Sequence, residues 1–336
     1  MLWAGADMTQ QLRRFFLFSA VAGLAIYPLY GGEFYIQLLT KIMVMAVFAM
    51  SLDLLVGYAG LVSLGHAAFF GVAGYVAALL MPQYEAGNVW LTLPAALCAA
   101  TLLALVVGAL ALRTSGVYFI MVTLALAQML YYFVHDAEFA GGSDGMLIML
   151  KPEAVIFGWK PFDLNSPAHF YYVVLAVMLG VYFLLRAVLR SSFGHALAGI
   201  KSNEHRMRSL GFPVYRYKLA AFTLAGTVAG LAGYLGALQF GFVNPELLGW
   251  HQSGNVLMMV ILGGMGSLTG PVTGAFTLVL LQEFLTGLTK HWQVLMGSFI
   301  VLVALMLPHG LSGFSLTRYR LRAHTDTRTT PEKDHV

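Results

Sequence analysis

Charged residues are scarce in this chain of 336 residues: Asp, Glu, Lys and Arg together make up 10% of it, against 59% hydrophobic residues. Soluble domains usually carry about a quarter charged residues, so most of this surface is not suited to water. Cysteine is scarcer still, and the single Cys98 excludes an internal disulfide framework. The small net charge of +4 comes without a basic stripe interleaved with aromatics, which argues against nucleic-acid binding. The composition predicts an integral membrane protein with several spans.

Motifs that would supply energy or chemistry are also missing. The phosphate-loop pattern G-x-x-x-x-G-K-[ST], the metalloprotease pattern H-E-x-x-H and the Cys/His spacing of zinc sites do not occur. We therefore predict a chain that is not an enzyme and has no metal site and no cofactor of its own. A transporter of this kind would have to take its energy from elsewhere.

Long apolar stretches follow one another along the chain. Most reach the ~20 residues that, at about 1.5 Å each, cross a hydrocarbon core of ~30 Å. They lie at 15–30, 36–56, 61–81, 91–112, 117–134, 170–189, 219–240, 256–262, 271–288 and 292–307. Glycines interrupt the region 256–288, which could form two short helices, a re-entrant pair or one broken span. The sequence predicts an all-α polytopic membrane protein with about 8–10 transmembrane helices, one of them broken or re-entrant between Gly263 and Pro271.

Lys and Arg mark the loops expected to face the cytoplasm. They gather in 186–218 and at both ends of the chain, whereas the loop 135–169 is mainly acidic. We therefore predict a cytoplasmic N-terminus over 1–14, a transmembrane domain over 15–308 and a cytoplasmic polar tail over 309–336. Two cytoplasmic termini require an even number of crossings, which favours ten.

The loop 186–218 is unusually polar for a segment between apolar stretches, and its pattern indicates a short amphipathic helix. The residues predicted on its apolar face are Ala196, Ile200, Met207 and Leu210. The residues predicted mostly opposite are Lys201, Glu204, His205 and Arg208. Such a helix needs an apolar surface to lie on: the membrane, the protein's own bundle or a groove on a partner.

Few charges fall inside the apolar stretches. Lys41 and Asp53 lie near the ends of their predicted helix, where snorkelling or hydrogen bonding is usual. Glu283 lies nearer the middle of its segment, where a structural hydrogen bond and a pathway role are equally open. Small residues at three- and four-residue spacing, as in 57–75, allow close helix packing and also unwound backbone along a polar path.

Five blocks of sequence resemble, in order, the LivM-type permeases of branched-chain amino acid ABC importers. They are 57–75 (GYAGLVSLGHAAFFGVAGY), 114–125 (TSGVYFIMVTLA), 141–145 (GGSDG), the loop 192–211, and 262–275 (LGGMGSLTGPVTGA). The resemblance covers most of residues 36–308. It implies a permease subunit that carries leucine, isoleucine and valine, or related small amino acids, across the bacterial inner membrane.

The resemblance also implies partners and site residues. The partners are a second, LivH-type permease, two cytoplasmic ATPase subunits that use ATP, and a periplasmic solute-binding protein that docks near the loop 135–169. By analogy, the loop 192–211 couples to the ATPase through a short helix. The residues expected to serve this coupling are Gly194, His195, Ala196, Ile200, Lys201, Glu204, Arg208, Leu210 and Gly211. The residues we place along the translocation pathway are Ser63, His66, Tyr118, Thr123, Asn255 and Glu283.

Several positions depart from the family pattern. The family more often has arginine at His195 and Lys201, often has asparagine at Asp53, and commonly has an acid at Asn255. Related permeases handle urea, short amides or aromatic acids, so these cargoes stay open. A different class also stays open, a self-sufficient secondary carrier with Asp53, His66 or Glu283 as titratable relays.

Overall fold

The computed structural model describes residues 22–81, 87–153, 163–306 and 310–311. The segment 1–14, nearly all of the tail 309–336, and 154–162 of the acidic loop lie outside these residues. Within the described residues, six helices are long and apolar enough to cross a membrane, and two shorter apolar helices accompany them. The predicted all-α polytopic membrane architecture is confirmed.

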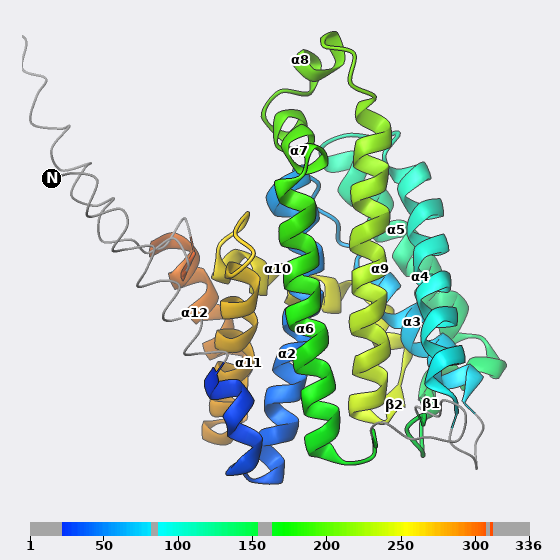
Figure 1. The fold of residues 1–336 in the computed structure, drawn as a ribbon, viewed down its shortest axis with the longest axis vertical. Helices are drawn as coiled ribbons and strands as arrows, with labels where there is room; N and C mark the ends of the chain where they lie inside the picture. The colour runs from blue at the N-terminus through cyan, green and yellow to red at the C-terminus, as the bar shows by residue number, and fades with distance from the viewer. Residues whose placement is uncertain (1–21, 82–86, 154–162, 307–309, 312–336) are drawn as a thin grey trace, which may run out of the picture.

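The fold is a bundle of helices with one small pair of strands (Figure 1). The helices are α2 (Glu33–Asp53), α3 (Ala67–Leu80), α4 (Val89–Ala111), α5 (Val117–His135), α6 (Pro167–Arg190), α7 (Ser192–Ser202), α8 (Glu204–Ser209), α9 (Val214–Phe240), α10 (Trp250–Gly263), α11 (Gly270–Leu288) and α12 (Trp292–Met306). Short helical turns are η1 (Tyr27–Leu29), η2 (Leu54–Ala59), η3 (Glu138–Ala140), η4 (Gly142–Asp144) and η5 (Pro245–Leu248). Strands β1 (Met146–Leu147) and β2 (Phe242–Val243) pair antiparallel.

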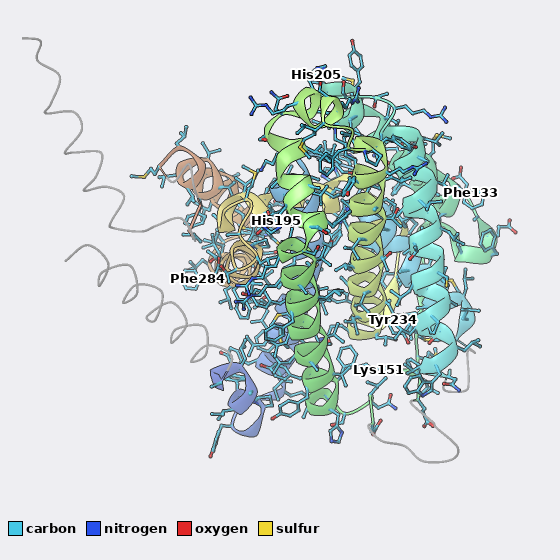
Figure 2. The ribbon with its side chains drawn as sticks, turned by 45° about the horizontal axis from the view of Figure 1, so that its top comes forward. Phe133, Lys151, His195, His205, Tyr234 and Phe284 are labelled. Carbon is cyan, nitrogen blue, oxygen red and sulfur yellow. The ribbon has the colours of Figure 1, made fainter. Side chains whose placement is uncertain are left out.

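The bundle has two distinct ends. Helices α7 and α8 lie at one end, called here the loop end, and β1 and β2 lie at the other, the strand end (Figure 1). Figure 2 shows the same separation, with His205 at the loop end and Lys151 at the strand end. The long helices α2, α6 and α9 run between the two ends.

Helix α2 forms the centre of the bundle. Every side chain from Ile42 to Asp53 is buried, because α6, α9, α10 and α11 all pack against this helix. A helix that is apolar all round is stable only when it is covered on all sides. The outer helices instead expose large apolar side chains such as Phe133 and Phe284, which point away from the bundle (Figure 2). These exposed side chains suit contact with lipid.

Small residues let α3 and α9 approach closely. A Cβ on Gly233 would overlap the carbonyl of Phe70, and a Cβ on Gly226 would overlap the side chain of Ala104 on α4. Apolar side chains gain little by associating in lipid, so close backbone approach is what stabilises such contacts. The predicted role of the glycines in helix packing agrees with this geometry.

The predicted span 61–81 is not one continuous helix. Gly60 adopts a left-handed conformation (φ 70°) that ends η2, and the backbone stays non-helical until α3 begins at Ala67. The start of α3 is buried inside the bundle, where the N–H of Ala67 donates to Ser253 Oγ at 2.9 Å. Unwound backbone at this depth is tolerated only when its polar groups are satisfied in this way.

The predicted break between Gly263 and Pro271 is confirmed, and it separates two helices that pack against each other. α10 ends at Gly263 and α11 begins at Gly270. The contact is close because a Cβ on Gly274 would overlap the carbonyl of Met259. With 14 residues, α10 is about 21 Å long, shorter than a full span.

Candidate functional site: the loop-end junction and the cavities along α10

The polar loop folds into two helices and not into one. Asn203 is extended between α7 and α8, and its side chain caps α8 by accepting a hydrogen bond from the Arg206 N–H at 2.9 Å. The prediction of a single apolar face running through Leu210 is therefore wrong, because the break turns α8 away. Ala196 and Ile200 are buried, whereas Leu210 is 66% exposed.

The apolar face of α7 lies on the protein's own bundle. Ala196, Leu197 and Ile200 are buried there, and α7 packs against α6, α9 and η2. Gly194 has no space for a side chain, since a Cβ would overlap the backbone of Leu189. His195 is exposed, and its Nδ1 donates to the Ser191 carbonyl at 2.8 Å. A partner can therefore reach the His195 face of α7 but not the Ala196 and Ile200 face.

Lys201 ties α7 to the end of α2. Its Nζ donates to the carbonyl oxygen of Gly57 at 2.5 Å, and its Cγ lies 3.2 Å from the position a Cβ would take on Gly60. Gly57 belongs to the π-helical turn η2. Such wide turns interrupt the regular hydrogen bonding of an α-helix, often at functional sites. Helix α7 is thus bonded directly to the turn η2 that continues the central helix α2.

Asp53 ties the turn between α10 and α11 to the same place. Its Oδ1 accepts a hydrogen bond from the Gly266 N–H at 2.8 Å, and its side chain is fully buried. A Cβ on Gly57 would overlap both the Asp53 carboxylate and the backbone of Gly266. Of the two expected roles for Asp53, snorkelling is excluded and hydrogen bonding is observed. Asp53, Gly57, Lys201 and Gly266 are called here the loop-end junction.

Glu204 holds α8 against the start of α9. Its carboxylate accepts hydrogen bonds from Arg208 Nη2 and Lys218 Nζ, both at 2.6 Å. Partial burial raises the pKa of this carboxyl, but the hydrogen bonds and charges of Lys218 and Arg208 outweigh burial and lower it overall. Glu204 and Arg208, both predicted coupling residues, therefore act on each other. Gly211, the last predicted coupling residue, is exposed and takes a positive φ of 84°.

Three of the predicted pathway residues are packed in the core. His66 shares a hydrogen bond with Ser51 Oγ at 2.8 Å and stacks on Phe48. Ser63 Oγ accepts from the Gly65 N–H at 3.3 Å, and the carbonyl of Thr123 leaves no room for a side chain on Gly65. These groups stabilise the non-helical segment 60–66. None of them lines the two cavities described below.

The other predicted pathway residues are spread apart. Tyr118 is 73% exposed near the start of α5, and Glu283 is exposed on α11. Neither lines a cavity, so the structure does not bring the six predicted residues together. Asn255 alone among them lines both cavities.

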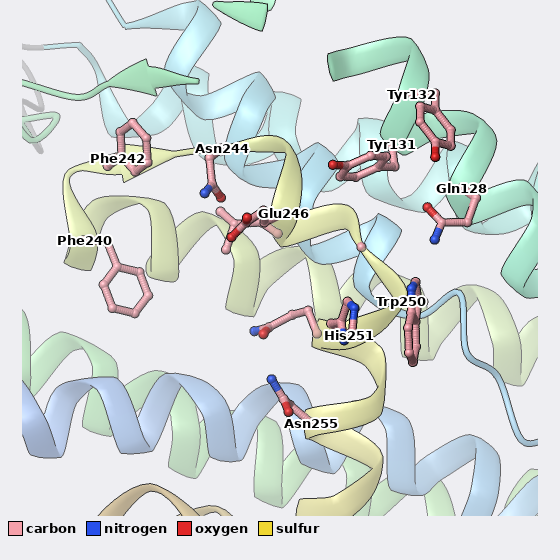
Figure 3. A pocket seen from close by; sticks show the side chains of 13 residues that line it. Gln128, Tyr131, Tyr132, Phe240, Phe242, Asn244, Glu246, Trp250, His251 and Asn255 are labelled. Carbon is pink, nitrogen blue, oxygen red and sulfur yellow. The ribbon is translucent and has the colours of Figure 1, made fainter. Parts of the chain in front are cut away.

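Two adjoining cavities follow α10 and the turn η5. The first, of about 740 Å³, lies between this segment and α5 (Figure 3). The second, of about 530 Å³, lies between it and α2, α11 and α12. The residues lining both are Phe240, Leu247, His251, Gln252 and Asn255. These volumes fall in the ~300–1,000 Å³ range of small-molecule sites.

The sequence analysis did not predict most of the polar residues that line the two cavities. Glu246, His251 and Gln252 lie before the predicted segment 256–262, in a stretch assigned to no helix. Lys41 lies eight residues after the start of α2 and lines the second cavity, so placing it near a helix end was wrong. The available signal was a run of polar residues directly preceding an apolar segment too short to span.

The described residues offer no evident chemistry. Gly141–Gly145 matches the pattern G-x-S-x-G, but Ser143 lies exposed in the turn η4, and its Oγ donates to the neighbouring Asp144 at 3.2 Å. A serine nucleophile needs a base within hydrogen-bond reach. Within the described residues, no group of three or more His, Cys, Asp and Glu side chains could hold a metal ion.

Comparison with known proteins gives the family. The model described as "Branched-chain amino acid transport system / permease component" matches residues 34–306. The chain belongs to this family. It is 30% identical to the high-affinity branched-chain amino acid transport permease protein LivM of Escherichia coli, over 95% of this chain and 78% of that protein. It is 29% identical to LivM of Salmonella typhimurium, over 95% and 79% of the two chains.

A more distant relative is also a branched-chain amino acid transport permease by name. The probable branched-chain amino acid permease LivH of Methanocaldococcus jannaschii is 25% identical over 53% of this chain and 56% of its own length. No solved structure matches. The resemblance to LivM-type permeases is confirmed, and this multi-pass inner-membrane chain is a permease subunit of an ABC importer rather than a self-sufficient carrier.

Proposed function

We propose that this permease subunit moves leucine, isoleucine and valine, or related small amino acids, across the bacterial inner membrane. Its partners in this proposal are a second, LivH-type permease, two cytoplasmic ATPase subunits and a periplasmic solute-binding protein. ATP is bound and hydrolysed by the ATPases, so the chain needs no catalytic residue and no cofactor of its own. The observation that carries the proposal is the match of residues 34–306 to the branched-chain amino acid permease family, and the bond from Lys201 on α7 to Gly57 in η2 gives a contact through which a partner could act on the bundle.

The ATPases would contact the exposed side of the loop 186–218. The accessible groups are His195 on α7 and the exposed surface of α8, because Ala196 and Ile200 pack on the bundle. A displacement of α7 would pull on Gly57 through Lys201. The same junction holds Gly266 through Asp53, so the movement would reach α10 as well.

Helix α10 connects this junction to the cargo path. Asn255 lies eight residues, about 12 Å, before Gly263, where α10 ends next to the turn that holds Gly266. It lines both cavities, so a shift of α10 would change their shape. In this proposal the second permease closes the open side of the cavities, and both termini lie in the cytoplasm with the ATPases.

Cysteine cross-linking tests the docking side. In a Cys98→Ala background, His195→Cys should cross-link to the ATPase subunit, while Ile200→Cys should not react because that side chain is buried. Equal cross-linking at both positions would show that α7 leaves the bundle, and it would contradict the proposal that a displacement of α7 is transmitted to Gly57 through Lys201. Competition of labelled leucine uptake by urea, short amides or aromatic acids would decide among the cargo classes.

A further inference from the structure

Two opposite charges line the cavities without forming an ion pair. Lys41 is half-buried in α2 and faces the second cavity, and Glu246 in η5 faces the first. Neither side chain has a salt bridge within the described residues. Charges at membrane depth are costly and are kept where they pair with each other or line a polar path.

The two charges differ in burial, because Lys41 is half-buried in α2 whereas Glu246 is exposed in η5, where it lines the first cavity. Lys41 follows the first residue of α2, Glu33, by eight positions, which is about 12 Å along the helix. In η5, Leu248 fills the space above Gly71 of α3, and Gly71 lies nine positions, about 13 Å, before the last residue of that helix. Leu248, two residues after Glu246, and Lys41 therefore lie at comparable distances from the strand-end termini of α3 and α2.

The residues between these charges are mixed in character. Leu247, His251 and Gln252 line both cavities, so these three residues form a wall that the two cavities share. Met45 and Met259 supply apolar, adaptable surface to the second cavity. Figure 3 shows Glu246, His251 and Asn255 following one another along η5 and α10 at the first cavity.

Building on the proposed function, we propose that Glu246 and Lys41 are the two charged contacts for a zwitterionic amino acid inside this permease. Glu246 would meet the ammonium group and Lys41 the carboxylate, while the shared wall would contact the side chain. A free amino acid carries both charges, and desolvating either one without a partner is expensive. Opposite charges in two cavities that share lining residues match that requirement, whereas an uncharged cargo would not need them.

The test measures leucine uptake and ATP hydrolysis in proteoliposomes that hold the complete importer with its binding protein. Lys41→Gln and Glu246→Gln should each lower maximal uptake at least about tenfold, the effect of losing one charge-assisted contact. Half-saturation should stay unchanged, because the binding protein sets it, and binding-protein-stimulated ATP hydrolysis should continue. Lys41→Arg and Glu246→Asp should recover uptake, which a merely structural defect would not predict.

The matched controls are Lys290→Gln and Glu33→Gln, exposed charges that line neither cavity. Uptake by the two cavity variants at the level of these controls would overturn the inference. If Lys41→Gln and Glu246→Gln do not assemble, Asn255→Cys in a Cys98→Ala background gives a second readout. Saturating leucine with binding protein should slow its modification by a thiol reagent, and an unchanged rate would again overturn the inference. Wild-type importer without ATP-dependent leucine uptake would refute the proposed function instead.

Discussion

Removing the amino group of Lys201 gives the sharpest test of the loop-end junction. In Lys201→Met the aliphatic stem can still pack on Gly60, but the 2.5 Å bond from Nζ to the Gly57 carbonyl is lost. Hydrogen bonds to charged groups contribute about 1.5–3 kcal/mol. Because Lys201 is otherwise exposed, the lower end of this range applies, about 1.5 kcal/mol. This free energy corresponds to about a tenfold change in the ratio of α7 bonded to Gly57 to α7 without that bond.

The expected result is uncoupling and not loss of the complex. In proteoliposomes with the full importer, Lys201→Met should lower leucine uptake per ATP hydrolysed by about tenfold, while the ATPase subunits still co-purify. Lys201→Arg should keep most of the coupling, because a guanidinium can reach the same carbonyl. The assay compares labelled leucine uptake with phosphate release in the same vesicles.

Arg206→Met is the matched control, since Arg206 is an exposed cation of the same loop whose side chain makes no hydrogen bond within the described residues. It should leave the leucine-to-ATP ratio unchanged. A wild-type ratio in Lys201→Met would refute the role of the Gly57 bond. Equal losses in both variants would assign the effect to the charge of the loop.

Three further substitutions probe the fold and the junction. Asp53→Asn retains an acceptor for the Gly266 N–H and should keep leucine uptake within about twofold of wild type. Asp53→Ala removes the acceptor and should lower uptake about tenfold. Loss of uptake in both variants would favour a titratable relay. Gly233→Ala should cost about 1–3 kcal/mol and lower the Tm in detergent, while Gly180→Ala, with open space around it, should not; equal Tm values would contradict the packing. Glu204 has a lowered pKa, so its stabilisation of α8 is fully present above the ordinary pKa of a glutamate carboxyl and is lost as the pH falls from there through the lowered pKa of the folded protein. A spin label on α8 should become mobile in acid, and in Glu204→Gln it should be mobile at neutral pH too; unchanged mobility would refute the contact.

The sequence identifies the long spans because their apolar runs exceed what a soluble protein needs, and α4, α5, α6 and α9 all lie where the runs predict. It fails where the chain leaves regular helix inside the bundle. The run 61–81 is apolar throughout, so composition alone does not reveal that Gly60 ends one helix and Ala67 starts another. The break at Asn203 is similar, because the helical pattern continues across it.

The candidate site was harder to predict than the fold, since it depends on contacts between distant segments. The bond from Asp53 to Gly266 and the approach of Gly57 to the same backbone join residues far apart in the chain. The first half of α10 was missed because His251, Gln252 and Asn255 interrupt the apolar pattern. Those side chains face a cavity and not lipid, which is why a helix at this depth can carry them.

The central claim, that separate ATPases energise this permease, is tested most directly by uptake of labelled leucine into two kinds of proteoliposome. One kind holds this chain, the second permease, both ATPase subunits and ATP, and the other lacks the ATPases. The binding protein is present outside in each. The account predicts uptake against a gradient only in the first kind. Concentrative uptake in the second kind, driven by a proton or sodium gradient, would contradict it.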